Sequence, residues 1–146
     1  MTDQSIVSYN SVINPQYQVF VVFADSEQYT EIKEALTSMN KSIGALWVGT
    51  KNIFIDGERV IEEGIDKDQL VAIEAHEIAH SMLNHEAGLD AQSEKEADLL
   101  AIALLETFGY RRSAQFIKDR IKEIYNIDYT SFEKEWNESN EEDLSL

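Results

Sequence analysis

The pattern with the clearest chemistry in this sequence is His76-Glu77-Ile78-Ala79-His80, which reads H-E-x-x-H. Two histidines four residues apart lie on the same face of a helix, so their imidazole nitrogens can converge on one divalent cation such as zinc. Glu77 projects about 100° away from His76 around the helix, where it misses the cation but reaches a water on it and can take its proton. With 3 histidines in the chain, chance would give this motif on the order of once per hundred such chains.

A catalytic zinc site needs a third protein ligand and one open position. A third histidine six residues after the motif is one solution, but Glu86 stands there, and Leu83 stands where that pattern has glycine. His85 falls one residue too early. We expect it outside the ligand set, either as a histidine at the helix end or as a group that helps to stabilise an oxyanion.

The other common third ligand is a glutamate on the next helix. Glu94 and Asp98 are four residues apart and share one helical face, and the small Ala97 and Ala101 on that side allow a close approach to the histidine helix. We therefore expect Glu94 to be the third ligand. Asp98 is expected to accept a hydrogen bond from a ligand histidine, a contact that fixes the orientation of the ring.

The combination of these two helices resembles a known group of enzymes. H-E-x-x-H followed on the next helix by E-x-x-A-D, here Glu94 to Asp98, is similar to the pattern of the gluzincin metallopeptidases over about residues 70–105. The short chain is most similar to the small soluble ImmA/IrrE-type peptidases or to another minimal gluzincin domain. Those peptidases often have Asn where this chain has Asp98.

The resemblance implies a fold, a cofactor and an activity. The fold would be a small zincin-like domain, and one Zn²⁺ per chain would be held by His76, His80 and Glu94. Glu77 would be the general base of peptide-bond hydrolysis. The substrate would be an extended protein or peptide segment, paired antiparallel with an edge strand that lies within residues 45–56.

The hydrophobic patterning predicts the elements that position these residues. It predicts one α+β domain, with a short, mostly antiparallel sheet packed on several helices that include the helix of the motif. β-branched and aromatic runs predict a strand at 17–24, a hairpin of strands at 45–48 and 52–55, and a short strand at 59–61. Apolar residues at three-and-four spacing predict helices at 26–39, 66–84, 90–108, 112–125 and 129–136.

Several residues are expected to begin or end these helices. Ser26 is a candidate N-cap, Ser93 with Glu96 reads as a capping box, and Gly109 stands where the helix at 90–108 should end. Large aromatic side chains are expected in the core, namely Trp47, Phe54, Phe108, Phe116, Phe132 and Trp136.

Length and charge bound the possible functions. A chain of 146 residues with 43% hydrophobic residues fits one domain, expected at 17–137 between an N-terminal extension (1–16) and an acidic, disordered tail (138–146). There are 28 acidic against 12 basic residues, a net charge of -16. Such a surface repels phosphate and anionic lipid, so we expect no binding to nucleic acid or to a membrane surface.

The cysteine count and the hydropathy pattern exclude further classes of protein. The chain has 0 cysteines, which excludes disulfides, Cys-type zinc fingers, iron–sulfur clusters and thiol catalysis. The longest apolar run, Leu99–Leu105, is far shorter than the roughly 20 residues that span a bilayer. The N-terminal residues lack the pattern of a secretory signal, so a cytoplasmic location is expected.

Two functions remain open from the sequence. The first is a zinc-dependent endopeptidase that cleaves an extended protein segment, with Glu77 as the general base. The second is a catalytically silent zincin-fold binding or regulatory module. The sequence also leaves open the substrate, the oligomeric state and whether the tail 138–146 blocks the cleft. It does not decide whether His85 or Tyr110 stabilises the transition state, or whether manganese, iron or cobalt replaces zinc.

Overall fold

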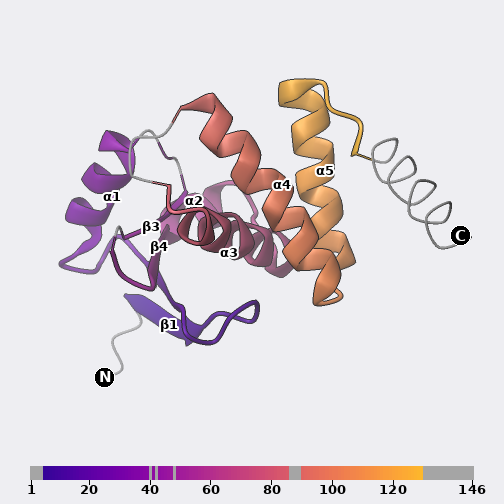
Figure 1. Ribbon diagram of the computed structural model, residues 1–146. Coiled ribbons are helices and arrows are strands. Elements are labelled where there is room, and N and C mark those ends of the chain that lie inside the picture. Colours follow the sequence, from indigo (N-terminus) through magenta and orange to yellow (C-terminus); the bar gives the residue numbers. More distant parts are fainter. Residues whose placement is uncertain (1–4, 40, 42, 48, 86–89, 130–146) are drawn as a thin grey trace, which may run out of the picture.

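The computed structural model of the chain describes residues 5–39, 41, 43–47, 49–85 and 90–129. As the sequence predicts, the chain is an α+β protein in which helices pack against a small sheet (Figure 1). Its elements are β1 (Ile6–Asn10), β2 (Gln18–Val22), α1 (Tyr29–Ser38), β3 (Gly44–Leu46), β4 (Asn52–Asp56), α2 (Gly57–Glu62), α3 (Lys67–Met82), α4 (Ala91–Thr107) and α5 (Arg111–Tyr125).

The sheet has the strand order β1-β2-β4-β3. The pairs β1–β2 and β3–β4 are antiparallel, as expected for most of the sheet, and the central pair β2–β4 is parallel. In the central pair, Val21 lies opposite Ile55, and both are buried on one face. Alternate strand residues point to opposite faces, so Phe20 and Phe54 stack on the other face with their ring centroids 5.2 Å apart.

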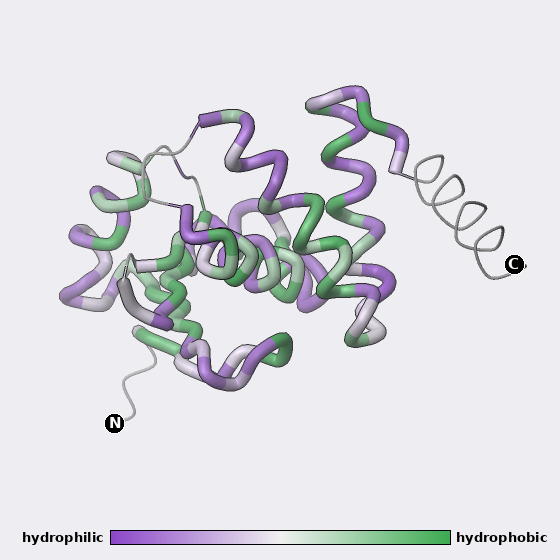
Figure 2. The backbone as a smooth tube through the Cα atoms, in the orientation of Figure 1, coloured by the Kyte–Doolittle hydropathy of each residue, from purple (hydrophilic) through white to green (hydrophobic). Residues whose placement is uncertain are grey.

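Helices cover both faces of the sheet. Helix α1 packs on the face of Phe20 and Phe54, while α3 packs on the opposite face with α4 and α5 beyond it (Figure 1). The main core lies between the sheet, α3, α4 and α5, and Figure 2 shows hydrophobic stretches of these elements meeting at the centre of the molecule. This arrangement puts the H-E-x-x-H helix in the middle of the molecule, between the sheet and α4.

Small residues let the elements around α3 approach one another closely. Ala79 of α3 and Ala97 and Ala101 of α4 are fully buried, which confirms the close helix contact expected from the two alanines of α4. Gly44 has the same effect between β3 and α3, because a Cβ atom there would lie 3.0 Å from Cγ2 of Ile73. Side chains from α3, α4 and the residues next to β3 can therefore meet.

Two aspartates begin the helices that carry the candidate site. Asp66 accepts a hydrogen bond from the N–H of Gln69, whose side chain accepts one from the N–H of Asp66, and this capping box begins α3. Asp90 accepts from the N–H of Ser93 and begins α4. The predicted capping box of Ser93 with Glu96 is therefore wrong, because Asp90 caps the helix three residues earlier.

The sequence prediction misassigns the connection after β4. The β-branched Val60 and Ile61 predict a strand at 59–61. These residues instead lie in helix α2. The cause is Asp56, whose carboxylate accepts hydrogen bonds from the N–H groups of Glu58 and Arg59 and so caps a helix at this point. A good N-cap outweighs the weak strand preference of so short a segment.

The prediction also misplaces the start of the sheet and of α1. Residues 6–10, expected within an extension, form the edge strand β1, whose largely exposed side chains give no buried alternation to recognise. Ser26 is not the N-cap of α1: the helix begins after Gln28, and the Ser26 hydroxyl accepts from the Gln28 N–H in the preceding turn. Gly109, with φ of 84°, does follow the end of α4 as expected.

Three aromatic residues expected in the core are exposed, namely Trp47, Phe108 and Phe116. The predicted helix at 129–136 and the tail at 138–146 lie outside the described residues, apart from Tyr129. Within the part of the chain that the structure describes, no helix has the length and apolar character needed to cross a membrane.

Candidate metal centre

The two motif histidines and Glu94 meet where α3 and α4 cross. His76 and His80 are buried on α3, and their Nε2 atoms lie 3.1 Å apart. Glu94, in the first turn of α4, places Oε2 2.9 Å from Nε2 of His76 and Oε1 3.3 Å from Nε2 of His80. The structure therefore brings together the three residues that the spacing singled out as one ligand set.

The three residues lie close enough together to hold one metal ion. Ligand atoms about 2.0–2.1 Å from a tetrahedral zinc lie about 3.3–3.5 Å from one another. The two Nε2 atoms lie 3.1 Å apart, and each faces a different oxygen of Glu94, at 2.9 and 3.3 Å. One ligand atom from each of the three residues lies within 4.8 Å of the other two. Two imidazole nitrogens and one carboxylate also form the donor set that zinc prefers in catalytic sites.

The second ring nitrogen of His76 has a buried partner. Nδ1 of His76 donates to Oδ1 of Asp98 at 2.8 Å, which confirms the contact predicted from the position of Asp98 on α4. This bond leaves the lone pair of a neutral ring on Nε2, the atom that faces His80 and Glu94. Arg120 of α5 lies behind the aspartate, with Nε 3.7 Å from Oδ2.

His85 contacts the second ring nitrogen of His80. Asn84 takes a left-handed conformation with φ of 56° after the end of α3, and the N–H of His85 bonds back to the carbonyl of His80 at 3.0 Å. This helix end folds the His85 ring against His80, with the two Nδ1 atoms 2.9 Å apart. As expected, His85 lies outside the ligand group, but its contact with the ring of His80 was not foreseen.

Burial and charge act together on the ligand residues. Burial alone would lower the pKa of His76, but hydrogen bonds to Asp98 and Glu94 raise that pKa to about 9. Burial would raise the pKa of Glu94, but hydrogen bonds from His76, His80 and Lys41 hold it well below its usual range. Glu94 is thus an anion, and the cluster favours a positive charge between its ligand atoms.

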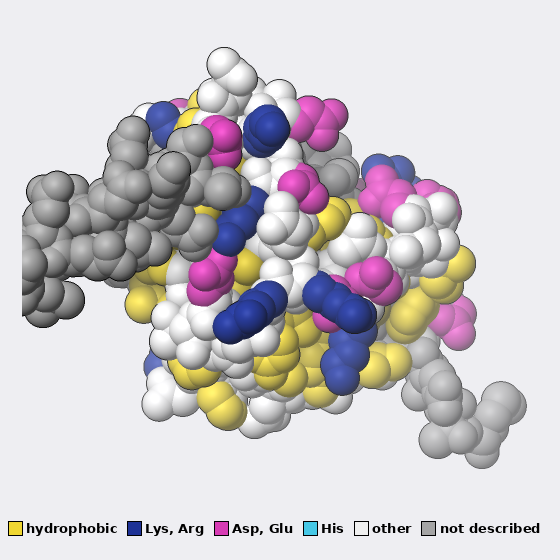
Figure 3. Space-filling view, turned by 90° about the vertical axis from the view of Figure 1, so that its right-hand side faces the viewer, with side chains coloured by type: hydrophobic (Ala, Val, Ile, Leu, Met, Phe, Trp, Pro, Cys, Tyr) yellow, Lys and Arg dark blue, Asp and Glu magenta, His cyan; other side chains and the backbone are white. Residues whose placement is uncertain are grey.

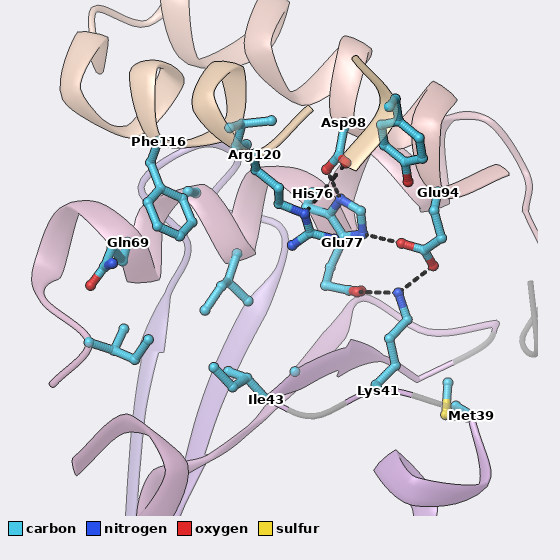
Figure 4. Close-up of a pocket in the computed structure, with 16 residues that line it drawn as sticks. Met39, Lys41, Ile43, Gln69, His76, Glu77, Glu94, Asp98, Phe116 and Arg120 are labelled. Atoms are coloured by element: carbon cyan, nitrogen blue, oxygen red, sulfur yellow. Dashed lines mark hydrogen bonds and ion pairs between the residues drawn. The ribbon is translucent and has the colours of Figure 1, made fainter. Parts of the chain in front are cut away.

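Glu77 faces the neighbouring cavity, where a cation stands beside it. The side chain of Glu77 is 3% exposed, and Nζ of Lys41 lies 3.6 Å from Oε1 of Glu77 and 2.6 Å from Oε1 of Glu94. Among the described residues, Oε1 of Glu77 has no hydrogen-bond partner. Figure 4 shows Lys41 reaching up between the two glutamates, with Asp98 on the far side of His76.

The cavity has a volume of about 320 Å³, with His76 and the acidic side chains on one side and apolar side chains on the other. Besides His76, Glu77, Glu94 and Asp98, side chains from the residues before β3, from α3 and from α5 line it, among them Lys41, Ile43, Ile73, Phe116, Arg120 and Tyr125. Tyr110, a candidate for stabilising the transition state, packs against the core and is not part of the lining.

Sequence reasoning missed the residues that reach the cavity from distant segments. Lys41 stands 35 positions before His76, and Arg120 and Tyr125 belong to α5, so no local spacing relates them to the motif. One signal was available for α5: it holds five of the 12 basic residues of an acidic chain, namely Arg111, Arg112, Lys118, Arg120 and Lys122. Figure 3 views the molecule from the side of α5 and shows Lys and Arg side chains beside hydrophobic ones.

No protein-family model, curated protein or solved structure matches the chain. Inferences about its function therefore depend on the residues and geometry of the cluster itself.

Proposed function

We propose that this protein is a zinc-dependent endopeptidase of gluzincin type. The observation that carries the proposal is the convergence of His76, His80 and Glu94 on one point, with the buried carboxylate of Glu77 beside that point and facing a cavity. A purely structural cluster would need no carboxylate next to the ligand atoms that lacks a hydrogen-bond donor.

The chain supplies the groups that peptide hydrolysis requires. A zinc ion held by the three ligands would supply a Lewis acid that acidifies water and polarises a peptide carbonyl. Glu77 accepts a proton from the attacking water as the water oxygen bonds to the carbonyl carbon and the π electrons move to the carbonyl oxygen. Glu77 then gives this proton to the amide nitrogen as the C–N bond breaks, leaving a carboxyl group and an amine.

The position of β3 supports an extended substrate. β3 is an edge strand of the sheet, and Gly44 within it and Ile43 just before it line the cavity that contains Glu77. A peptide added antiparallel to that edge would place a carbonyl group near the ligand cluster and one side chain in the cavity. Ile43, Ile73 and Phe116 would then favour an apolar side chain next to the bond that is cleaved.

The decisive measurement is the metal content of the gently purified protein by elemental analysis. We expect about one zinc per chain for the wild type and little or none for Glu94→Ala. The matched control is Glu96→Ala, which changes another glutamate in the same turn of α4 outside the ligand group and should retain the zinc. No metal in the wild type, even after zinc is added, would contradict the proposal.

Activity separates the two functions that the sequence leaves open. Zinc-loaded wild type is incubated with a denatured, fluorescently labelled protein, and new amino termini are counted. Cleavage that is removed by a chelator and restored by zinc supports the endopeptidase. Stoichiometric zinc without any cleavage would instead favour the catalytically silent binding or regulatory module.

A further inference from the structure

Lys41 has a backbone position that is fixed on both sides. Its N–H donates to the carbonyl of Leu36 at 2.8 Å, a bond that closes the C-terminal end of α1, and two residues later the carbonyl of Ile43 accepts from the N–H of Asp56 at 2.7 Å. Lys41 is therefore held between α1 and the edge strand β3. A side chain anchored in this way can present its ammonium group at a defined place.

The ammonium group lies in the cavity, against the carboxylate of Glu94. The Lys41 side chain is 17% exposed, and its Nζ bonds to Oε1 of Glu94, while Oε2 of Glu94 faces His76. Among the described residues Glu94 is its one hydrogen-bond acceptor, because the 3.6 Å distance to Glu77 makes an ion pair only. An ammonium has three N–H donors, so two remain for a ligand in the cavity.

We propose that Lys41 is a catalytic residue that donates a hydrogen bond to the carbonyl oxygen of the scissile peptide as negative charge develops on it. This inference rests on the proposed function of the same site. When Glu77 takes the proton of the attacking water, its negative charge disappears and one negative charge forms on the carbonyl oxygen. Lys41, which pairs with Glu77 beforehand, then pairs with the carbonyl oxygen instead. Its hydrogen bond to that oxygen is strongest in the transition state, when the oxygen carries the negative charge.

The other polar groups near the cluster are less well placed for this task. His85 is turned to His80 and does not line the cavity. Tyr110 packs against the core and does not line the cavity either. Arg120 pairs with Asp98, behind the ligand His76. Gln69 also lines the cavity, but its side chain is held at the first turn of α3, where Oε1 accepts from the N–H of Asp66. The hydroxyl of Tyr125 lines the cavity as well and is tested beside Lys41.

The test compares Lys41→Met, which keeps the length of the side chain and removes its charge, with Tyr125→Phe and with Lys33→Met. Lys33 lies on the exposed face of α1 and is the matched control. For each zinc-loaded protein we would measure zinc content, kcat and KM on a peptide that the wild type cleaves. Calorimetry would measure the affinity for a phosphinic peptide, whose tetrahedral anion imitates the transition state.

We expect Lys41→Met to retain one zinc per chain and a KM within about threefold of the wild type. Its kcat should fall about 10²- to 10³-fold, as for loss of one oxyanion donor. Its affinity for the phosphinic peptide should fall by a similar factor, whereas Lys33→Met should match the wild type. Lys41→Arg should recover part of the lost kcat, because it restores the charge with a different donor geometry.

Other results would overturn the assignment. An unchanged kcat and unchanged phosphinic-peptide affinity in Lys41→Met would exclude the role of Lys41, and a loss found in Tyr125→Phe instead would transfer it to that hydroxyl. Loss of zinc from Lys41→Met would mean that Lys41 only positions Glu94. Failure of the proposed function gives different results: the wild type binds no zinc, or Glu77→Gln cleaves as fast as the wild type. Either result would also exclude the role of Lys41.

Discussion

Glu74 and Glu77 lie one turn apart on α3, and both are almost fully buried, yet their surroundings differ. Oε1 of Glu74 accepts a hydrogen bond from the N–H of Val12 at 3.3 Å, and Oε2 accepts one from the hydroxyl of Tyr9 at 3.4 Å. Within the described residues, Oε1 of Glu77 accepts no hydrogen bond, and the ammonium of Lys41 lies 3.6 Å from it. Glu74 thus faces the N-terminal segment, and Glu77 faces the cavity.

The difference separates a carboxylate that holds the fold together from one that, under the proposed function, serves as the general base. Burial raises the pKa of Glu74, even though its hydrogen bonds act in the opposite direction, and those bonds join β1 and the segment after it to α3. A buried carboxylate oxygen without a hydrogen-bond donor costs stability, and Oε1 of Glu77 is such an oxygen among the described residues. The four predictions that follow test this division of roles.

The largest effect is expected for Glu77→Gln. The amide has nearly the same volume but cannot accept a proton, so cleavage by the zinc-loaded protein should fall about 10²- to 10⁴-fold. Zinc content should stay at one per chain. The free energy of unfolding should change by less than about 1 kcal/mol, because Oε1 of Glu77 accepts no hydrogen bond among the described residues and the variant removes only its 3.6 Å ion pair with Lys41. Progress curves and urea denaturation on the same preparation measure both. Full activity of this variant would show that Glu77 is not the base.

Asp98→Asn should weaken zinc binding. Asp98 has one bonded oxygen, as Glu74 does, and one without a hydrogen bond, as Glu77 does. Oδ1 accepts from the ring of His76, while Oδ2 has no hydrogen-bond partner among the described residues and lies 3.7 Å from Nε of Arg120. Replacing the charge behind a ligand histidine commonly lowers metal affinity about 10- to 100-fold. Competition with a chelating dye measures this, and Asp119→Asn on the exposed side of α5 is the control. Equal zinc affinity in both variants would remove Asp98 from the metal site.

Glu74→Ala should affect stability and leave the chemistry intact. The variant leaves the N–H of Val12 and the hydroxyl of Tyr9 without their acceptor, so the free energy of unfolding should fall by about 1–3 kcal/mol. Zinc content and the cleavage rate of the folded protein should remain within about twofold of the wild type. Urea denaturation and the cleavage assay check the two parts. A variant that keeps its stability and loses activity would reverse the roles assigned to the two glutamates.

Local spacing accounts for the part of the site that could be predicted. His76, Glu77 and His80 share one helix, and the four-residue interval between Glu94 and Asp98 fixes their common face on the next helix. The small Ala97 then indicates that the two helices touch. For the same reason the helices at 66–84 and 90–108 were predicted nearly as the structure has them, since apolar periodicity is strongest in long helices.

Long-range contacts account for what could not be predicted. Lys41 approaches Glu77 only because α1 ends and β3 begins where they do, and no interval in the sequence encodes that path. Residues 6–10 were not recognised as β1 because an exposed edge strand lacks buried alternation. Residues 59–61 were misassigned because one capping residue, Asp56, decided between helix and strand.

The smallest effect tests the bond that supports Glu74. Tyr9→Phe removes the hydroxyl that donates to Glu74, and at pH 7 the free energy of unfolding should fall by about 0.5–1.5 kcal/mol. Burial, together with the charge of Glu74, raises the pKa of Tyr9 above its ordinary value of 10.0.

This shift predicts how the difference between wild type and Tyr9→Phe depends on pH. Because the folded pKa of Tyr9 is the higher one, its contribution to stability is complete below pH 10.0 and is lost as the pH rises above that value, where Tyr9 ionises more readily in the unfolded chain. The stability difference should therefore shrink above pH 10.0, while every other tyrosine cancels in the comparison. A difference that stays constant from pH 7 to 11 would mean that the folded protein does not raise the pKa of Tyr9.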